Sequence, residues 1–538
     1  MKKIFLFIFG SLGLLILSSC SFFYNLVIKN PPSWTFSEIV SKINQDLDIS
    51  FESAIQPETS KFYYNSFYEQ EPKKIVSFQY SDQSGSISQT YQQNLLGSYF
   101  TNYADWLYDP QETYAVYIDL AYGVVYIRDE KNLDYLKVDN SNLNSFHLQQ
   151  FGFTGLPNVG KYDVLVVPID FSNVRYNEIQ LDDLNLVFNG SSAQTGWESV
   201  ASYYYKSSSG QLDLTFDFAE VYHSANPTYH YQMMGQRGAN QVINEYLGSS
   251  PNVDFSAYDH NDDNYVDSII FVYSNAQNYD IKPWWAWCEV LKDTKINNNL
   301  NVGFIQWISY NFINLKYGGF HPNVNAETYI HETGHLLGLL DYYTNNNTEP
   351  TGGLDMMARN IGDHTAVSKM LLNWISPKDY GMGVSVNLRD YALSGDFLII
   401  PYNNDFKVFG EYYILLNYQP TGLYEGAKNS HFGYNGQGVM LYHIDARLAF
   451  NPYNQFRIFL NNNVDGFKKK FIELVDFSAY NTINLGISYD VLLQPGSWQI
   501  NLPWNTLGDN NQPSNTQISL NLSPFNGDQS LNVTIAYI

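Results

Sequence analysis

Apolar and polar residues follow a different pattern in each of three successive parts of the chain. The stretch TFSEIVSKINQDL (35–47) has apolar residues at helical spacing and a capping-box pair at its start, which predicts a helix. From there to about Asn144 apolar and polar residues alternate, and TYAVYIDLAYGVVYIRD (113–129) has the pattern of a β-hairpin. We therefore expect an amino-terminal domain over residues 21–155.

The middle of the chain alternates between strand and helix patterns. KYDVLVVPIDFSN (161–173) is a continuous apolar run, typical of a central strand that is buried on both faces. GWESVASYYYKSSSGQLDLTFDF (196–218) begins like a helix and continues as an alternating strand, and such mixed patterns persist to about Pro377. They predict a domain over residues 156–380 that contains a mixed sheet and helices.

The last part of the chain, from about Gly381, has a third pattern. Short alternating stretches are broken by Gly, Asn and Pro, and the last of them is SLNVTIAYI (530–538). This pattern predicts an all-β, sandwich-like region over residues 381–538. The expected fold class of the whole chain is α+β.

The first residues, MKKIFLFIFGSLGLLILSSC (1–20), have the pattern of an export signal. Two lysines precede an apolar run, and that run is shorter than the roughly 20 apolar residues that span a bilayer. The ending resembles a bacterial lipobox, which implies cleavage before Cys20 and attachment of lipid to its thiol. The alternative is an ordinary signal peptide in which a cysteine falls there by chance. The lipobox predicts a protein anchored by lipid on the extracellular face of the bacterial cell membrane.

Charge and cysteine content narrow the range of partners. The formal net charge is -24, from 53 acidic and 29 basic residues, so a phosphate backbone would be repelled and we expect no nucleic-acid partner. The chain has two cysteines. If Cys20 carries lipid, Cys288 is unpaired and no internal disulfide can form. Because it lies among tryptophans in WWAWCEV, we expect Cys288 to be a buried, inert thiol.

The stretch HETGHLLGLLDYY (331–343) combines side chains that bind metals. On a helix, His331 and His335 lie on one face about 5–6 Å apart at Cβ, which is close enough to share one ion. The carboxylate of Glu332 can reach a metal-bound water without being a ligand, as a general base must. Taken alone, this pattern also occurs where two surface histidines flank a glutamate by coincidence.

Two further residues extend the pattern. Gly338 could end the helix in a left-handed conformation and turn the chain back. That return would bring Asp341 to the same ion as a third ligand, and a carboxylate oxygen is an acceptable ligand of zinc. Three protein ligands leave the fourth position open for water. The sequence therefore predicts a catalytic zinc site rather than a structural one.

With Asp341 as third ligand, the HExxHxxGxxD pattern resembles that of the immune inhibitor A-like family of bacterial secreted zinc metallopeptidases, which are metzincin-like. GGLDMMARN (352–360) is similar to the Met-turn of that family, with Met357, or alternatively Met356, as the methionine under the zinc. The resemblance covers about residues 161–447. It implies a metzincin-like zincin catalytic domain with a mixed sheet and an active-site helix.

The resemblance also implies a function, a cell-surface zinc-dependent endopeptidase that hydrolyses protein substrates by Glu-assisted attack of zinc-bound water. Glu332 would take the proton and deliver it to the leaving amine. Candidate oxyanion partners are Tyr342, Tyr343 and His364, which could instead pack around the floor of the site. The alternatives are a non-catalytic surface lipoprotein that binds host or matrix proteins, and a structural protein whose zinc only stabilises folding. The retained Glu332 argues against the first. In a peptidase, the amino-terminal domain over residues 21–155 is either an inhibitory prosegment or an accessory module.

A second metal site, for Ca²⁺, is suggested by DHNDDNYVD (259–267). Oxygen donors recur there at alternate positions, namely Asp259, Asn261, Asp263, the carbonyl of Tyr265, and Asp267. Asn264 stands where an EF-hand has glycine, and no glutamate closes the loop. The alternative is a solvated acidic turn. The expected cofactors are thus Zn²⁺, with Ca²⁺ as a second candidate.

Overall fold

The computed structural model describes most of the chain after residue 154 and separate segments before it. The gaps after residue 154 are 236, 261–263, 282, 292–293, 298–299, 316–322, 345–349, 403–405, 407–410, 428–433, 447, 451–455, 459–469, 478–490 and 508–512. The described segments before it are 36–47, 60–64, 73–79, 87, 89–90, 101–103, 106–108, 114–119 and 124–129. The signal sequence and Cys20 lie outside these residues. Within them, no helix has both the length and the apolar character needed to cross a bilayer.

The chain divides into two compact units. The first comprises residues 1–78, 82–118 and 125–139, and the second comprises 79–81, 119–124 and 140–538. Residues 156–380 and 381–538 therefore belong to one compact unit, and the domain boundary expected at residue 380 stays a prediction.

The amino-terminal part contains one described helix of several turns and one sheet. The helix α2 (Phe36–Leu47) confirms the helix predicted there, and Ile43 and Leu47 are buried. Six strands form the sheet in the order β1-β2-β6-β5-β4-β3. Their bounds are β1 Ser60–Tyr64, β2 Lys73–Gln79, β3 Thr101–Tyr103, β4 Trp106–Tyr108, β5 Tyr114–Asp119 and β6 Val124–Asp129. The strands β5 and β6 are neighbours, as the predicted hairpin requires.

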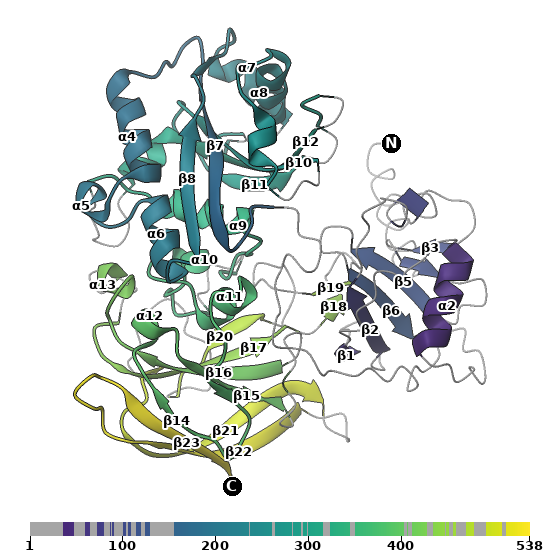
Figure 1. Ribbon diagram of the computed structural model, residues 1–538, viewed down its shortest axis with the longest axis vertical. Coiled ribbons are helices and arrows are strands. Elements are labelled where there is room, and N and C mark those ends of the chain that lie inside the picture. The colour runs from purple at the N-terminus through teal and green to yellow at the C-terminus, as the bar shows by residue number, and fades with distance from the viewer. Residues whose placement is uncertain are drawn as a thin grey trace, which may run out of the picture. The chain divides into compact units, whose positions relative to one another are not determined.

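The second unit begins with a mixed sheet in the order β11-β12-β10-β7-β8, and β9 extends the pairing of β7 (Figure 1). The bounds are β7 Gly160–Asp170, β8 Leu212–Phe218, β9 Tyr222–His223, β10 Tyr265–Tyr273, β11 Trp287–Val290 and β12 Asn301–Ser309. β7, β8, β10 and β12 are parallel, whereas the terminal strand β11 is antiparallel to β12. The last seven residues of β7 are buried, as its apolar run predicts.

Helices cover both faces of this sheet. Their bounds are α4 Glu178–Asn189, α5 Ser192–Thr195, α6 Val200–Ser207, α7 Thr228–Gln232, α8 Arg237–Gly248 and α9 Glu327–Leu336, with 3-10 turns η3 Phe255–Tyr258 and η4 Tyr310–Asn314. On one face, Tyr231 of α7 and Val242 of α8 pack with Val167 of β7. The helices α4 and α6 contact β8, and α9 contacts β11 and β12. The predicted mixed sheet with helices is confirmed.

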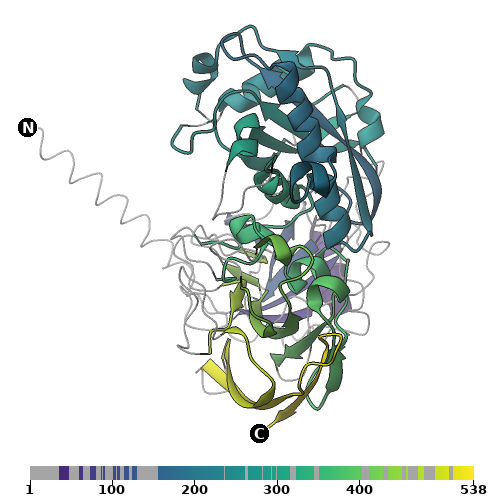
Figure 2. The same cartoon turned by 90° about the vertical axis from the view of Figure 1, so that its left-hand side faces the viewer.

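The remainder of the second unit contains two larger sheets that share one core. The first has the order β13-β15-β16-β17-β20, the second β14-β23-β22-β21, and β18 pairs with β19. The bounds are β13 Asp379–Tyr380, β14 Ser385–Leu388, β15 Phe397–Pro401, β16 Glu411–Tyr418, β17 Gly438–Asp445, β18 Leu448–Phe450, β19 Phe456–Ile458, β20 Ile472–Leu474, β21 Gly496–Leu507, β22 Pro513–Leu522 and β23 Leu531–Tyr537. Leu398 and Leu415 of the first sheet lie in one apolar cluster with Leu520 and Val533 of the second, green and yellow in Figure 2.

The expectation of an all-β carboxy-terminal region needs one correction. Two helices of a single turn, α12 (Tyr391–Ser394) and α13 (Tyr424–Ala427), lie between its strands. In α12 the Asp390 side chain accepts a hydrogen bond from the backbone N–H of Ala392, and Gly395 ends the turn in the left-handed conformation. These local signals produce a helical turn inside a strand pattern. The α+β class of the chain is confirmed.

Candidate metal centre

The helix α9 (Glu327–Leu336) carries both histidines and is held at its start by an asparagine. The Asn325 side chain accepts a hydrogen bond from Glu327 N and donates one to the Glu327 carboxylate, at 2.8 and 3.0 Å. Every residue from Glu327 to Gly334 is buried. The helix is covered on several sides, because α9 contacts β11 and β12, α6 and also α10 (Met356–Arg359).

The structure brings the three predicted ligands together. The rings of His331 and His335 have their centroids 4.9 Å apart. After α9, Gly338 adopts a φ of 97° and donates its N–H to the His335 carbonyl, so the chain turns back as predicted. Asp341 Oδ1 then lies 3.1 Å from His331 Nε2 and 3.3 Å from His335 Nε2. The ligand atoms of the three residues all lie within 4.8 Å of one another.

The outer nitrogens of both rings face backbone carbonyls. His331 Nδ1 lies 2.8 Å from the Met356 carbonyl oxygen, and His335 Nδ1 lies 2.8 Å from that of Leu339. A carbonyl oxygen only accepts hydrogen bonds, so each Nδ1 carries a hydrogen and each Nε2 of a neutral ring presents a lone pair. Two lone pairs and a carboxylate oxygen of Asp341 therefore converge, an arrangement that is favourable only with a cation between them. This donor set fits a metal ion.

A proton takes the place of that cation when no metal is bound. Burial disfavours the charge on His335, but the Asp341 carboxylate outweighs burial and raises the pKa of His335 to about 9. Burial alone would raise the pKa of Asp341, but the pull of His335 and the hydrogen bonds from both rings hold the pKa of that carboxyl well below its usual value. Without a metal, His335 and Asp341 therefore form a partly buried ion pair.

Glu332 lies next to the first ligand and is buried, with 6% of its surface exposed. Burial raises the pKa of its carboxyl, and the two histidines oppose that shift. The thiol of Cys288, on β11, lies 3.1 Å from the Glu332 carbonyl oxygen and 3.6 Å from Oε2. Burial and the Glu332 charge raise the pKa of this thiol, so it stays protonated and can donate to Glu332. Cys288 is half-buried rather than fully buried, and the sequence did not link it to the site.

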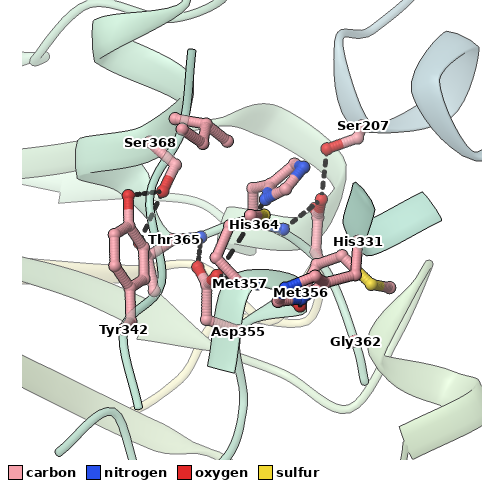
Figure 3. Close-up of polar contacts among 12 residues, drawn as sticks. Ser207, His331, Tyr342, Asp355, Met356, Met357, Gly362, His364, Thr365 and Ser368 are labelled. Atoms are coloured by element: carbon pink, nitrogen blue, oxygen red, sulfur yellow. Dashed lines mark hydrogen bonds and ion pairs between the residues drawn. The ribbon is translucent and has the colours of Figure 1, made fainter. Parts of the chain in front are cut away.

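Both methionines of the predicted Met-turn lie beneath α9. They belong to α10, which begins at Met356, and both are fully buried. A Cβ added at Gly334 would lie 2.5 Å from the Met357 sulfur, so Met357 packs directly against the helix between the two histidines. The carbonyl of Met356 accepts from His331, as Figure 3 shows. The two residues therefore have different contacts with the centre.

The three candidate oxyanion partners lie in different surroundings. The Tyr343 ring stacks over His331, with centroids 6.4 Å apart. Tyr342 is fully buried and its hydroxyl bonds Ser368 at 2.7 Å. His364 is also fully buried, and its ring packs against Tyr204 and others. Of the three, Tyr343 is the one whose ring contacts a ligand.

The candidate calcium loop is described only in part, because Asn261 and Asp263 lie outside the described residues. Asn264 has a φ of 67°, the left-handed conformation that the predicted turn requires. The Asp267 carboxylate faces the backbone N–H and the ring of His260, at 3.2 and 2.7 Å. Calcium binding stays a prediction.

Comparisons with known proteins give a distant likeness among solved structures alone. No family model matches the sequence, and no curated protein matches it. The crystal structure of metalloproteinase-II from Bacteroides fragilis matches over 60% of this chain and 78% of its own, with 12% identity and a TM-score of 0.22. A TM-score of this size does not establish a shared fold.

Proposed function

We propose that this protein is a zinc-dependent endopeptidase of the metzincin-like, immune inhibitor A-like type. The observation that supports it is the convergence of His331 Nε2, His335 Nε2 and an Asp341 oxygen within 4.8 Å of one another, beside a buried Glu332. Two imidazoles and one carboxylate are the donors of catalytic zinc sites, which keep one position open. Calcium or magnesium would be bound by oxygen donors instead.

Each residue of the centre has a role in this proposal. A bound zinc ion would polarise the scissile carbonyl and acidify a water molecule. Glu332 accepts the proton of the attacking water and passes it to the leaving amine, and its raised pKa suits both steps. The hydrogen bonds at each Nδ1 hold the rings of His331 and His335 with Nε2 toward Asp341. Tyr343 is the candidate donor to the developing oxyanion.

The position of β11 supports a polypeptide as the substrate. β11 is the terminal strand in the order of its sheet, and its Cys288 lies against Glu332. An extended peptide that adds to a terminal strand is held by backbone hydrogen bonds, which suit any sequence. A peptide bound along β11 would pass the general base.

The proposed location of the protein is the cell surface, and the support for it comes from the sequence. The lipobox-like ending at Cys20 and the preceding apolar run support an exported protein held on the extracellular face of the bacterial cell membrane. The strong negative charge suits a solvated surface and gives no support for nucleic-acid binding.

The test is cleavage of casein by the purified protein. We expect cleavage that stops with a zinc chelator and returns with zinc, and we expect Glu332→Gln to lower the rate at least about 100-fold, the scale of general-base catalysis, while zinc stays bound. The control is Glu178→Gln on α4, where the side chain is exposed. Equal cleavage by the Glu332 variant would remove the proposed mechanism. A zinc-loaded wild-type protein that cleaves neither casein nor a mixed protein substrate would be a binding protein instead.

A further inference from the structure

Two buried carboxylates lie behind the metal centre without touching its ligands. Asp355 and Asp363 are 0% and 1% exposed, and Asp355 is labelled in the polar network of Figure 3. A buried carboxylate destabilises a protein unless hydrogen bonds or an ion pair compensate for its lost hydration. The partners of each carboxylate therefore indicate what it does.

Asp363 is compensated by a cation and joins two helices. It accepts from the Ser207 hydroxyl of α6 at 2.5 Å and from His364 N at 2.8 Å. Its other oxygen pairs with Lys369 Nζ at 2.5 Å, on the helix α11 (Ala366–Leu371). None of these partners makes a hydrogen bond to the Met-turn or to a ligand. Asp363 is thus a structural tie between α6 and α11.

Asp355 has a different set of partners. Its two oxygens accept from the backbone N–H groups of Met357 and Thr365, both at 2.6 Å. These groups open the helices α10 and α11, so one carboxylate fixes the start of both. The ring of His364 approaches only to 4.0 Å, and neither of its nitrogens has a hydrogen-bond partner in the described structure.

Met356, which follows Asp355 in the chain, contacts a ligand of the metal centre. Met356 lies between Asp355 and Met357, and its carbonyl oxygen receives the Nδ1 hydrogen of His331 at 2.8 Å. If the first turn of α10 shifted, this acceptor would move away from the ring. A neutral imidazole without that acceptor could take the other tautomer or rotate, and either change removes the Nε2 lone pair from the ion.

We propose that Asp355 is a positioning residue for metal binding: it clamps the first turn of α10 and so holds the Met356 carbonyl against His331. The proposal rests on the metal site proposed above at His331, His335 and Asp341. It assigns Asp355 a contribution to metal affinity that acts through the backbone and that Asp363, equally buried and nearby, does not share.

The experiment compares Asp355→Asn with Asp363→Asn in the full chain. Asparagine keeps the volume of aspartate but replaces one acceptor oxygen by an NH2 group, which cannot accept a hydrogen bond from a backbone N–H. We expect Asp355→Asn to weaken zinc binding by about 10- to 100-fold, as other changes behind metal ligands do, measured by competition with a chromophoric chelator. Asp363→Asn loses the partner of Lys369 and is expected to lower the melting temperature of the metal-free protein while it leaves the zinc affinity unchanged.

Co²⁺ absorption and the variant Asp355→Ser test the same role of Asp355 independently. The visible absorption of bound Co²⁺ should change in Asp355→Asn and stay as in the wild type in Asp363→Asn. Asp355→Ser keeps an N-cap for α10 and loses the bond to Thr365, but it places no NH2 group against the Thr365 N–H. We therefore expect it to fold and to show a smaller loss of zinc affinity than Asp355→Asn.

The possible results separate the two proposals. Unchanged zinc affinity in both Asp355 variants, or an equal loss in Asp363→Asn, would overturn the positioning role. A wild-type protein that binds no zinc would instead overturn the metal site itself.

Discussion

In the metal-free protein, His335 holds a proton that a metal ion must displace. Its pKa is raised to about 9, because the Asp341 carboxylate outweighs the effect of burial. A raised pKa means that the ring is charged at neutral pH, so each zinc that binds releases one proton. We expect zinc affinity to rise about tenfold per pH unit between pH 7 and 8, since one proton competes with the metal. Titration calorimetry in two buffers of different ionisation enthalpy measures the proton release.

An unperturbed histidine would behave differently in the same experiment. With a pKa near 6.5 it would already be neutral at pH 7, and zinc affinity would be flat above that pH. A flat profile would therefore show that Asp341 does not hold the proton on His335.

The side chains of the centre could be predicted from the sequence, but their supports could not. Helical spacing brings His331 and His335 together, and a left-handed Gly338 returns the chain to Asp341. Cys288 comes from a strand 44 residues before Glu332, and no spacing rule joins them. The acceptors for the outer ring nitrogens are backbone carbonyls, whose positions depend on the tertiary fold and not on residue type.

The close packing of α9 on α10 makes Gly334 sensitive to substitution. A Cβ there would lie 2.5 Å from the Met357 sulfur and 3.2 Å from the Tyr204 hydroxyl oxygen. In an open helix, Gly→Ala would stabilise by roughly 1 kcal/mol. At Gly334 we expect the opposite, a loss of about 1 to 3 kcal/mol in the free energy of unfolding from overpacking, measured by denaturant titration.

The matched control for this prediction is Gly248→Ala in α8. A Cβ at Gly248 would meet nothing within 4 Å, so no loss is expected there. If Gly334→Ala proved as stable as Gly248→Ala, Met357 could move aside freely and the packing of α10 on α9 would be loose.

For individual helices and strands, the sequence predicted the type of each element better than the neighbours that contact it. The apolar run of β7 and the helix-to-strand pattern of α6 and β8 appear where expected. The spacing of His331 and His335 places them on one face of α9, but it does not show that β11, β12, α6 and α10 all contact this helix. Periodicity shows which residues share a face of a helix, and it does not show how many neighbours the helix will have.

In the whole molecule, the metal centre and the carboxy-terminal sheets belong to one compact unit. All eight residues of β16 are buried, and only alternate ones, such as Tyr413 and Leu415, belong to the core between the two sheets. On the metal-centre side, the Tyr391 hydroxyl donates to the His364 carbonyl at 2.9 Å, and Leu474 N donates to the Pro350 carbonyl at 2.6 Å. The segment that supports the centre is therefore bonded to the carboxy-terminal region.

These contacts predict that the expected boundary at residue 380 does not separate two independent folding units. A protein of residues 140–538 should bind zinc and unfold in one cooperative thermal transition, because it contains nearly all of the second unit. Residues 140–380 alone should lack a cooperative transition and should not bind zinc, since the side chains that pack on the carboxy-terminal sheets would be exposed to water. Circular dichroism and zinc competition measure both. Folding and zinc binding by residues 140–380 would contradict the prediction and would make the carboxy-terminal sheets a separate domain.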